Sequence, residues 1–374
     1  MSWSGTEAAI GKRSAVACRL EDAMALSADV GKMLSGFGGL TPDSMIEAVE
    51  REVGKTFSGL ASPLPSYINR VYEFMAMDGE RYIAKFYRPG RWSRAAVEEE
   101  HVFVLDCARE EIPVVPPIEL PRGGTLAEAD GVFFALYPKR SGREIELSGD
   151  EAWRRLGALV ARMHNVGAEC DAPNRLTLSP ENTAGRDVDL LLGGGFVPKR
   201  LAERFRDVAG AILEAAAGLF DGIEKLRIHG DCHRANILER PGEGLMVIDF
   251  DDMMTGPPVQ DLWLLLPGRV DKCRREVDLL LDGYWSMRDF DDSTLRLVEP
   301  LRAMRMIYFL AWCARQSEDY SFREHFPDWG SDSFWMAEIA DLECQASAIR
   351  EADASWVGGG QARDVYVGRV LTDH

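Results

Sequence analysis

The sequence is poor in basic residues relative to acidic ones. Of its 374 residues, 43 are Lys or Arg and 61 are Asp or Glu, so the formal net charge is -18. The field of such a chain repels phosphate backbones and anionic membrane surfaces, and nucleic-acid binding would need a local basic patch. The sequence contains no such patch. We therefore expect no nucleic-acid partner and no membrane partner.

Long apolar runs and paired cysteines are also missing. No apolar run reaches the roughly 20 residues of a membrane-spanning helix, and residues 1–30 hold no apolar segment of signal-peptide length after Lys12-Arg13. The seven cysteines are scattered and form no CxxC pair, which is typical of reduced thiols that act mostly as small buried apolar side chains. We expect a cytoplasmic protein, and we assume a monomer because no sequence feature bears on the oligomeric state.

The composition that remains favours a folded chain of enzyme size. Hydrophobic residues make up 46% and charged residues 28%, which is globular composition. The length leaves room for one large two-lobed domain or two ordinary ones. Composition and Pro/Gly punctuation then divide the chain. We predict a flexible N-terminal extension over 1–40, a first lobe over 41–137, a hinge over 138–142, a helical second lobe over 143–350 and a loose tail over 351–374.

The first lobe has the hydrophobic period of β-strands over much of its length. Residues 67–87 predict an antiparallel hairpin that turns at Asp78-Gly79. A helical period follows over 94–109, and residues 131–137 predict a further strand.

The second lobe is mainly helical, beginning at Asp150, which we predict to cap a helix. One further hairpin is predicted inside this lobe. Its strands are expected at 226–229 and 245–249, with a short strand over 236–238 between them.

Three oxygen-bearing side chains stand at a spacing that phosphoryl transfer uses. Asn236 lies five residues after Asp231, and Asp249 lies thirteen residues after Asn236. Phosphoryl transfer needs a carboxylate that orients and deprotonates the acceptor hydroxyl, and hard oxygen ligands that hold Mg²⁺ on the nucleotide. The HxDxxxxN…D spacing matches the catalytic and metal-binding loops of kinases. The sequence therefore predicts an enzyme that uses ATP and Mg²⁺.

A zinc cluster is the competing interpretation of the same segment, because His229, Cys232 and His233 have the side chains of zinc ligands. Gly230 and the strand-to-loop context remove the helix that two histidines four residues apart would need. A purely structural Asp231 is disfavoured, since three residues rather than one fall on the kinase spacing. We interpret His229 as a loop residue that satisfies backbone groups rather than as a proton carrier.

A kinase site also needs a cation over the nucleotide phosphates, and Lys85 stands inside an otherwise apolar strand. A lone Lys in a strand is usually a solvated edge residue, but these apolar neighbours favour a paired one. Its partner should come from the helix that follows, where residues 98–100 are all Glu. We select Glu100 because Phe103 and Cys107 lie on the same helical stripe.

Taken together, these motifs resemble those of the stress response kinase A family of bacterial Ser/Thr protein kinases, within the aminoglycoside-phosphotransferase and protein-kinase-like superfamily. The resemblance covers about residues 41–340. The HGD…N and D…GPxxDL motifs occur throughout the superfamily, whereas the first and last of the matching segments are specific to the family. These segments are Ser66–Tyr72, Lys85–Pro89, Glu99–His101, His229–His233, Gly256–Trp263 and Glu299–Arg305.

The resemblance implies an α+β, bilobal protein-kinase-like fold with a small β-rich N-terminal lobe and a large α-helical C-terminal lobe. It also implies that Asp231 is the catalytic base and that Lys85 and Glu100 form an ion pair. Asn236 and Asp249 would bind Mg²⁺, and Asp261 would anchor the catalytic loop. The strip that meets adenine would be Leu136, Tyr137, Pro138 and Lys139.

The sequence departs from the pattern of eukaryotic kinases in the loop that would bind phosphate. The hairpin over 66–74 has no glycine, unlike the Gly-rich loop of eukaryotic kinases. Phosphate binding would therefore rest on backbone amides and on Ser66 or Asn69.

Two weaker signals remain open. Arg302, Arg305, Tyr308 and Trp312 lie at helical spacing, and they either pack in the core with their cations reaching the surface or line the acceptor cleft. His164 is expected to be a hydrogen-bonded residue of the core or of the support behind the site.

The expected reaction is transfer of the ATP γ-phosphoryl group to a hydroxyl. The resemblance favours Ser and Thr hydroxyls of proteins, in a stress response and with self-phosphorylation. A kinase acting on an amino alcohol, a sugar or an aminoglycoside-like molecule is the alternative. A nucleotide-binding scaffold without turnover is the third hypothesis, and the complete set of Lys85, Asp231, Asn236 and Asp249 argues against it.

Overall fold

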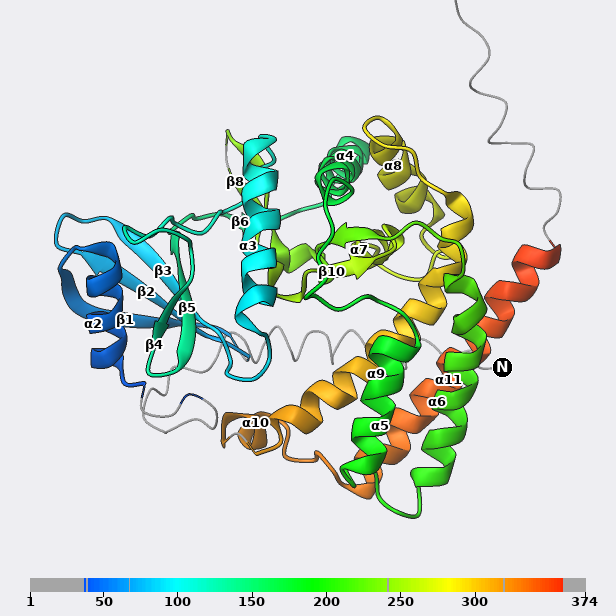
Figure 1. Cartoon of the computed structure of the whole chain (residues 1–374). Coiled ribbons are helices and arrows are strands. Elements are labelled where there is room, and N and C mark those ends of the chain that lie inside the picture. Colours follow the sequence, from blue (N-terminus) through cyan, green and yellow to red (C-terminus); the bar gives the residue numbers. More distant parts are fainter. Residues whose placement is uncertain (1–36, 38–39, 67, 241, 319, 359–374) are drawn as a thin grey trace, which may run out of the picture. The chain divides into compact units, whose positions relative to one another are not determined.

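The computed structural model describes residues 37, 40–66, 68–240, 242–318 and 320–358 (Figure 1). Its residues form two compact units. The first contains the described residues up to Arg143 together with Arg240–Asp251 and Ser317–Pro327, and the second contains Glu144–Glu239, Asp252–Gln316 and the described residues from Asp328 onward. The sequence had placed Arg240–Asp251 and Ser317–Pro327 in the helical lobe.

The predicted extension over 1–40 lies outside the described residues, except for Phe37 and Leu40. At the other end, helix α11 (Asp332–Gly358) runs through residue 351. The prediction of a loose tail is therefore wrong for residues 351–358, which continue a helix whose small and apolar residues pack in the core. The rest of the predicted tail, 359–374, lies outside the described residues.

The first unit is built on an antiparallel sheet with the strand order β1-β2-β3-β5-β4. The hairpin predicted to turn at Asp78-Gly79 is present as β2 and β3. Strand β1 was not predicted, because Gly59 and Pro63 interrupt its apolar pattern. The strands are β1 (Phe57–Leu64), β2 (Arg70–Ala76), β3 (Arg81–Phe86), β4 (Ala127–Ala129) and β5 (Val132–Pro138).

Helices α2 (Pro42–Val53) and α3 (Arg94–Arg109) also belong to the first unit, and α3 has the bounds that the sequence predicted. The side chain of Thr41 caps α2, and that of Ser93 caps α3. The core of this unit consists of aromatic and aliphatic side chains from the sheet and α2, among them Met45, Phe74, Phe86, Phe134 and Leu136. The unit is completed by β9 (Gly244–Val247) and α10 (Tyr320–His325).

The second unit is mainly helical, as predicted. Its helices are α4 (Asp150–Gly167), α5 (Arg186–Gly193), α6 (Ala202–Ala217), α7 (Val259–Trp263), α8 (Arg274–Trp285), α9 (Val298–Gln316) and α11. A π-turn at Glu181–Gly185 leads into α5, and short 3₁₀ turns occur at Gly218–Phe220, Arg234–Asn236, Phe250–Asp252 and Asp292–Leu297.

Two local predictions in the second unit are wrong. The strand over 226–229 is present as β7 (Leu226–Ile228), but it pairs with β10 (Met254–Gly256) and not with residues 245–249. The sequence missed β10 because it has only three residues. Asp150 is the first residue of α4 rather than its cap, and its carboxylate binds Arg275 instead. Strands β6 (Arg143–Glu144) and β8 (Ile237–Arg240) each contain residues that are assigned to both units.

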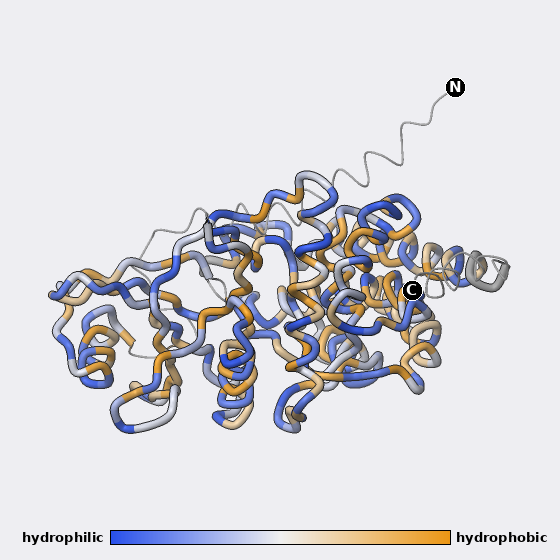
Figure 2. Tube along the Cα trace, turned by 90° about the horizontal axis from the view of Figure 1, so that it is seen from above, coloured by the Kyte–Doolittle hydropathy of each residue, from blue (hydrophilic) through white to orange (hydrophobic). Residues whose placement is uncertain are grey.

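Helices α4 and α8 pack closely because each has a glycine that faces the backbone of the other helix. A Cβ atom on Gly157 would lie 1.9 Å from the carbonyl oxygen of Leu280, and one on Gly283 would lie 1.9 Å from that of Arg154. Apolar and polar segments are interspersed along the helices (Figure 2). Within the described part of the chain, no helix is long and apolar enough to cross a bilayer.

Candidate active site

The loop that follows β7 is held by one buried carboxylate. Asp261, in α7, is fully buried, and its two oxygens accept hydrogen bonds of 2.8 Å from the backbone N–H groups of His229 and Gly230. The anchoring role expected for Asp261 therefore agrees with this geometry. Gly230 has φ +82, and a Cβ atom there would lie 2.1 Å from the carbonyl oxygen of Asp252, so only glycine fits the turn.

A second buried layer supports this anchor. Nε2 of His164 lies 3.1 Å from Oδ2 of Asp261, and Nδ1 of the same ring lies 2.9 Å from the hydroxyl of Tyr284. Both ring nitrogens are thus engaged, and His164 is fully buried. It is a supporting core residue, as the sequence indicated.

The anchored loop presents the carboxylate of Asp231. Its Oδ1 lies 2.5 Å from Nη2 of Arg305, and its Oδ2 lies 3.5 Å from Nε2 of His233. Burial alone would raise the pKa of Asp231, but Arg305 and His233 outweigh it and hold that pKa well below its usual range. Asp231 is therefore ionised at neutral pH and able to accept a hydrogen bond from a hydroxyl.

Asn236 is oriented by the same loop. Its amide nitrogen donates a 2.9 Å hydrogen bond to the main-chain oxygen of Asp231. The amide oxygen is therefore the atom that can coordinate a cation.

In the first unit, Lys85 lies among three carboxylates. Its Nζ is 3.7 Å from Glu100, 3.1 Å from Asp249 and 3.2 Å from Asp251. Burial would lower the pKa of Lys85, but the three carboxylates outweigh burial and raise that pKa well above its usual value. The structure thus brings together the predicted pair of Lys85 and Glu100. Glu98 is exposed, as expected of the solvated member of the Glu run.

Asp249 follows β9 and has φ 62, a left-handed conformation that is uncommon for a residue other than glycine. Its side chain is 55% exposed, so a carboxylate oxygen remains accessible while another contacts Lys85.

The carboxylate of Asp249 and the amide oxygen of Asn236 are the hard donors that Mg²⁺ prefers. Among the described residues, no group of three or more His, Cys, Asp or Glu side chains could hold a metal ion. Mg²⁺ usually keeps water and substrate phosphate oxygens as ligands and does not need an all-protein cage. His229 and Cys232 are instead buried, and burial raises the pKa of the Cys232 thiol well above its usual value.

The predicted adenine strip lies at the end of β5, and its side chains already have partners in the first unit. Leu136 is buried, and its carbonyl oxygen accepts a 2.7 Å hydrogen bond from the N–H of Ile118. The Tyr137 hydroxyl lies 3.1 Å from that of Tyr87, and Nζ of Lys139 lies 2.9 Å from Glu73. The N–H of Lys139 also donates a 3.1 Å hydrogen bond to the carbonyl oxygen of Arg81, so part of the main chain of this strip is engaged as well.

The two polar residues considered for the phosphates differ in their surroundings. Asn69 is buried, and its side-chain oxygen accepts a 3.1 Å hydrogen bond from the N–H of Arg88, so it holds the loop to the end of β3. Ser66 is half-buried. Tyr67, in the same motif, lies outside the described residues.

The candidate acceptor residues on α9 have different surroundings. Arg302 donates to the carbonyl oxygen of Gly268, and its guanidinium lies over the Trp263 ring at 4.9 Å, so it packs as the structural interpretation predicted. Arg305, by contrast, binds Asp231, and it lies 5.3 Å from the centre of the Tyr308 ring. Arg305 and Tyr308 therefore lie next to the candidate base.

Sequence reasoning missed two features. It named Arg305 only as an acceptor residue, and no spacing rule joins α9 to a loop 74 residues earlier. It also passed over Asp251, whose carboxylate contacts both Lys85 and Arg91. A signal was present, because Asp251 is separated from Asp249 by a single buried Phe250, which leaves both carboxylates near the end of the same strand.

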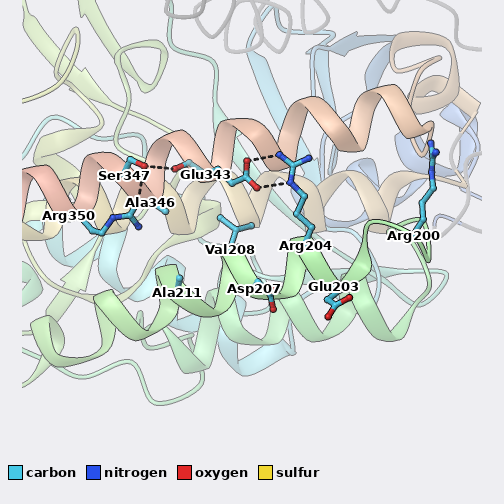
Figure 3. Close-up of a pocket in the computed structure, with 10 residues that line it drawn as sticks. All are labelled: Arg200, Glu203, Arg204, Asp207, Val208, Ala211, Glu343, Ala346, Ser347 and Arg350. Atoms are coloured by element: carbon cyan, nitrogen blue, oxygen red, sulfur yellow. Dashed lines mark hydrogen bonds and ion pairs between the residues drawn. The ribbon is translucent and has the colours of Figure 1, made fainter.

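A surface hollow between α6 and α11 lies apart from these residues (Figure 3). Arg204 and Glu343 face each other across it and form two hydrogen bonds of 2.6 Å. None of its lining residues belongs to the predicted site. We assign it no catalytic role.

Comparisons with known proteins agree with the site. A model of the phosphotransferase enzyme family matches residues 61–298. Stress response kinase A of Escherichia coli strain K12 is 34% identical over 316 residues, which are 84% of this chain and 95% of that protein. Serine/threonine protein kinase RdoA of Salmonella typhimurium strain LT2 is 32% identical over the same shares of the two chains.

Solved structures show the same fold. The amicoumacin kinase in complex with AMP-PNP, Ca²⁺ and Ami has a TM-score of 0.65 at 17% identity, covering 83% of this chain and 93% of that one. The microcompartment-associated aminopropanol kinase has a TM-score of 0.61 at 16% identity, covering 82% of this chain and 97% of that one. These structures confirm the α+β fold class, and the family model and the relatives above confirm the family that the motifs predicted. The chain thus belongs to the phosphotransferase enzyme family, grouped with the stress response kinase A proteins, and is a kinase.

Proposed function

We propose that this kinase transfers the γ-phosphoryl group of ATP to Ser or Thr hydroxyls of proteins. We also propose that it acts in a bacterial stress response, because its relatives are named stress response kinases. The observation that carries the proposal is the position of the Asp231 carboxylate, which Arg305 holds in a loop fixed by Asp261. The protein acceptor rests on the relative named as a serine/threonine protein kinase.

In the proposed reaction, Asp231 accepts a hydrogen bond from the acceptor hydroxyl and orients its oxygen for in-line attack on the γ-phosphorus. The hydroxyl proton passes to the carboxylate as the new O–P bond forms and ADP leaves. Lys85, held by Glu100, binds the phosphates as a point charge.

Asp249 and Asn236 are the residues that would hold Mg²⁺, which neutralises the charge of the phosphates when bound. The strip over residues 136–139 would meet adenine. Backbone amides of the loop between β1 and β2, together with Ser66, would meet the phosphates.

The purified protein with Mg·ATP should phosphorylate itself or a generic basic protein on Ser or Thr. A basic test protein is the suitable acceptor, because opposite charge favours encounter with a chain of net charge -18 at low salt. Radiolabel transfer followed by phosphoamino-acid analysis measures this. A parallel sample with EDTA should show no transfer.

The same experiment separates the alternative functions. If no phosphoprotein forms and one amino alcohol or sugar in an acceptor panel causes rapid ATP consumption, the protein is a small-molecule kinase. Binding of Mg·ATP without turnover on any acceptor would indicate a nucleotide-binding scaffold.

Asp249→Ala and Lys85→Ala should each weaken Mg·ATP binding and lower turnover. The first removes an anionic ligand of a hard cation, and the second removes the charge opposite the phosphates. We expect a loss of roughly 10-fold or more in affinity, since hydrogen bonds and ion pairs to charged groups contribute about 1.5–3 kcal/mol. Isothermal titration calorimetry checks this, and unchanged binding and rate in both variants would eliminate these assignments.

A further inference from the structure

The carboxylate of Asp251 has no place in the reaction as proposed, yet it is buried beside the catalytic lysine. Its side chain is 7% exposed, and its Oδ1 lies 3.2 Å from Nζ of Lys85. Its other oxygen, Oδ2, forms an ion pair with Arg91. Arg91 itself lies with its guanidinium 5.4 Å from the centre of the Trp92 ring.

The position of Arg91 in the chain connects two parts of the first unit. It lies between β3, which carries Lys85, and α3, which carries Glu100. The ion pair of Arg91 with Asp251 links the segment after β9 to the segment between β3 and α3. A second contact acts in parallel, because the ring of Phe250 meets that of Phe103, on α3, edge to face at 5.6 Å.

The cluster around Lys85 is rich in carboxylates. Lys85 is surrounded by the carboxylates of Glu100, Asp249 and Asp251. Arg91 brings a second cation to this group through its ion pair with Asp251. A buried carboxylate that loses its partner attracts the remaining cation more strongly and repels an approaching phosphate.

We propose that Arg91 is a positioning residue of the nucleotide site, which neutralises Asp251 and so keeps the ammonium of Lys85 available to the nucleotide phosphates. The inference rests on the proposed function, because it requires Lys85 to bind phosphate. Arg91 acts through Asp251 and Lys85, and it needs no contact of its own with the nucleotide.

The test is calorimetric binding of Mg·AMP-PNP to the full chain and its variants. Arg91→Met should raise Kd about 10-fold, within the range of coupling between neighbouring charged groups. The double variant Arg91→Met/Asp251→Asn also replaces the carboxylate that Arg91 binds by a neutral amide, so its Kd should return to within about threefold of the unchanged protein. In phosphotransfer, Arg91→Met should raise KM for ATP more than it lowers kcat.

Arg94→Met is the matched control. Arg94 lies three residues further along the chain, at the start of α3, pairs with the exposed Glu98 and lies over the Phe133 ring. Its removal deletes the same charge without touching Asp251, and Kd should stay within about twofold. If Arg91→Met does not fold, as judged by circular dichroism, Arg91→Gln replaces it with the same expectation.

The outcomes separate the two ideas. If the unchanged protein binds no Mg·AMP-PNP, the proposed function fails, and this inference fails with it. If the unchanged protein binds and Arg91→Met binds equally well, only the inference is overturned. A double variant that binds no better than Arg91→Met would also overturn it, because Arg91 would then act by a route that does not involve Asp251.

Discussion

The Asp231→Asn variant should lose phosphotransfer activity by roughly 10²–10⁴-fold, the usual contribution of a positioned acid–base group. Asparagine keeps the size and planarity of the side chain, and its amide oxygen can still accept from Arg305, which lies 2.5 Å from Oδ1 of Asp231. It cannot take up the proton of the acceptor hydroxyl. The loop should keep its shape, because its anchor is made by the backbone of His229 and Gly230 with Asp261.

The measurement is initial rates at saturating Mg·ATP, with calorimetric nucleotide affinity determined on the same preparation. Affinity should barely change, since Asp231 acts on the acceptor and not on the nucleotide. Asp207→Asn, at an exposed position of α6, makes the same chemical change away from the site and should keep full activity. Near-normal turnover of Asp231→Asn on a verified acceptor would show that another group is the base.

The spacing of residues along the chain was enough to name candidate site residues wherever a kinase motif or the period of one helix defines the position. Asp231 and Asp249 follow strands β7 and β9, and Asn236 lies five residues after Asp231, so their candidate roles could be inferred from the sequence. Glu100 could be selected from three consecutive Glu residues because a helix buries one stripe, and it is the member that the structure buries beside Lys85.

What the sequence could not supply were partners separated by many residues. Arg305 reaches Asp231 from α9, and Arg91 reaches Asp251 across 160 positions. Contacts of this kind depend on how helices and loops pack, which no local period encodes. Strand β10 was missed for a related reason, because three residues are too few to show a period and its pairing with β7 is decided by tertiary packing.

Asp261→Asn should destabilise the protein and disorganise the catalytic loop together. Asp261 is fully buried, and each of its oxygens accepts a 2.8 Å hydrogen bond from a backbone N–H, of His229 and of Gly230. In the amide variant one of these N–H groups must face an NH₂ group, which cannot accept. A buried donor left without an acceptor costs about 1–3 kcal/mol, so Tm should fall by roughly 5 °C.

The same substitution should also lower phosphotransfer, because the next residue after the freed backbone is Asp231. Displacement of a catalytic group by about 1 Å can cost roughly 100-fold in rate, and we expect a loss of about 10–100-fold at a temperature where the variant is folded. Differential scanning fluorimetry and initial rates measure the two effects, with Asp207→Asn again as the exposed control. If Tm fell but the folded variant kept full activity, Asp261 would stabilise the fold without positioning Asp231. If neither quantity changed, the two hydrogen bonds would not be what holds the loop.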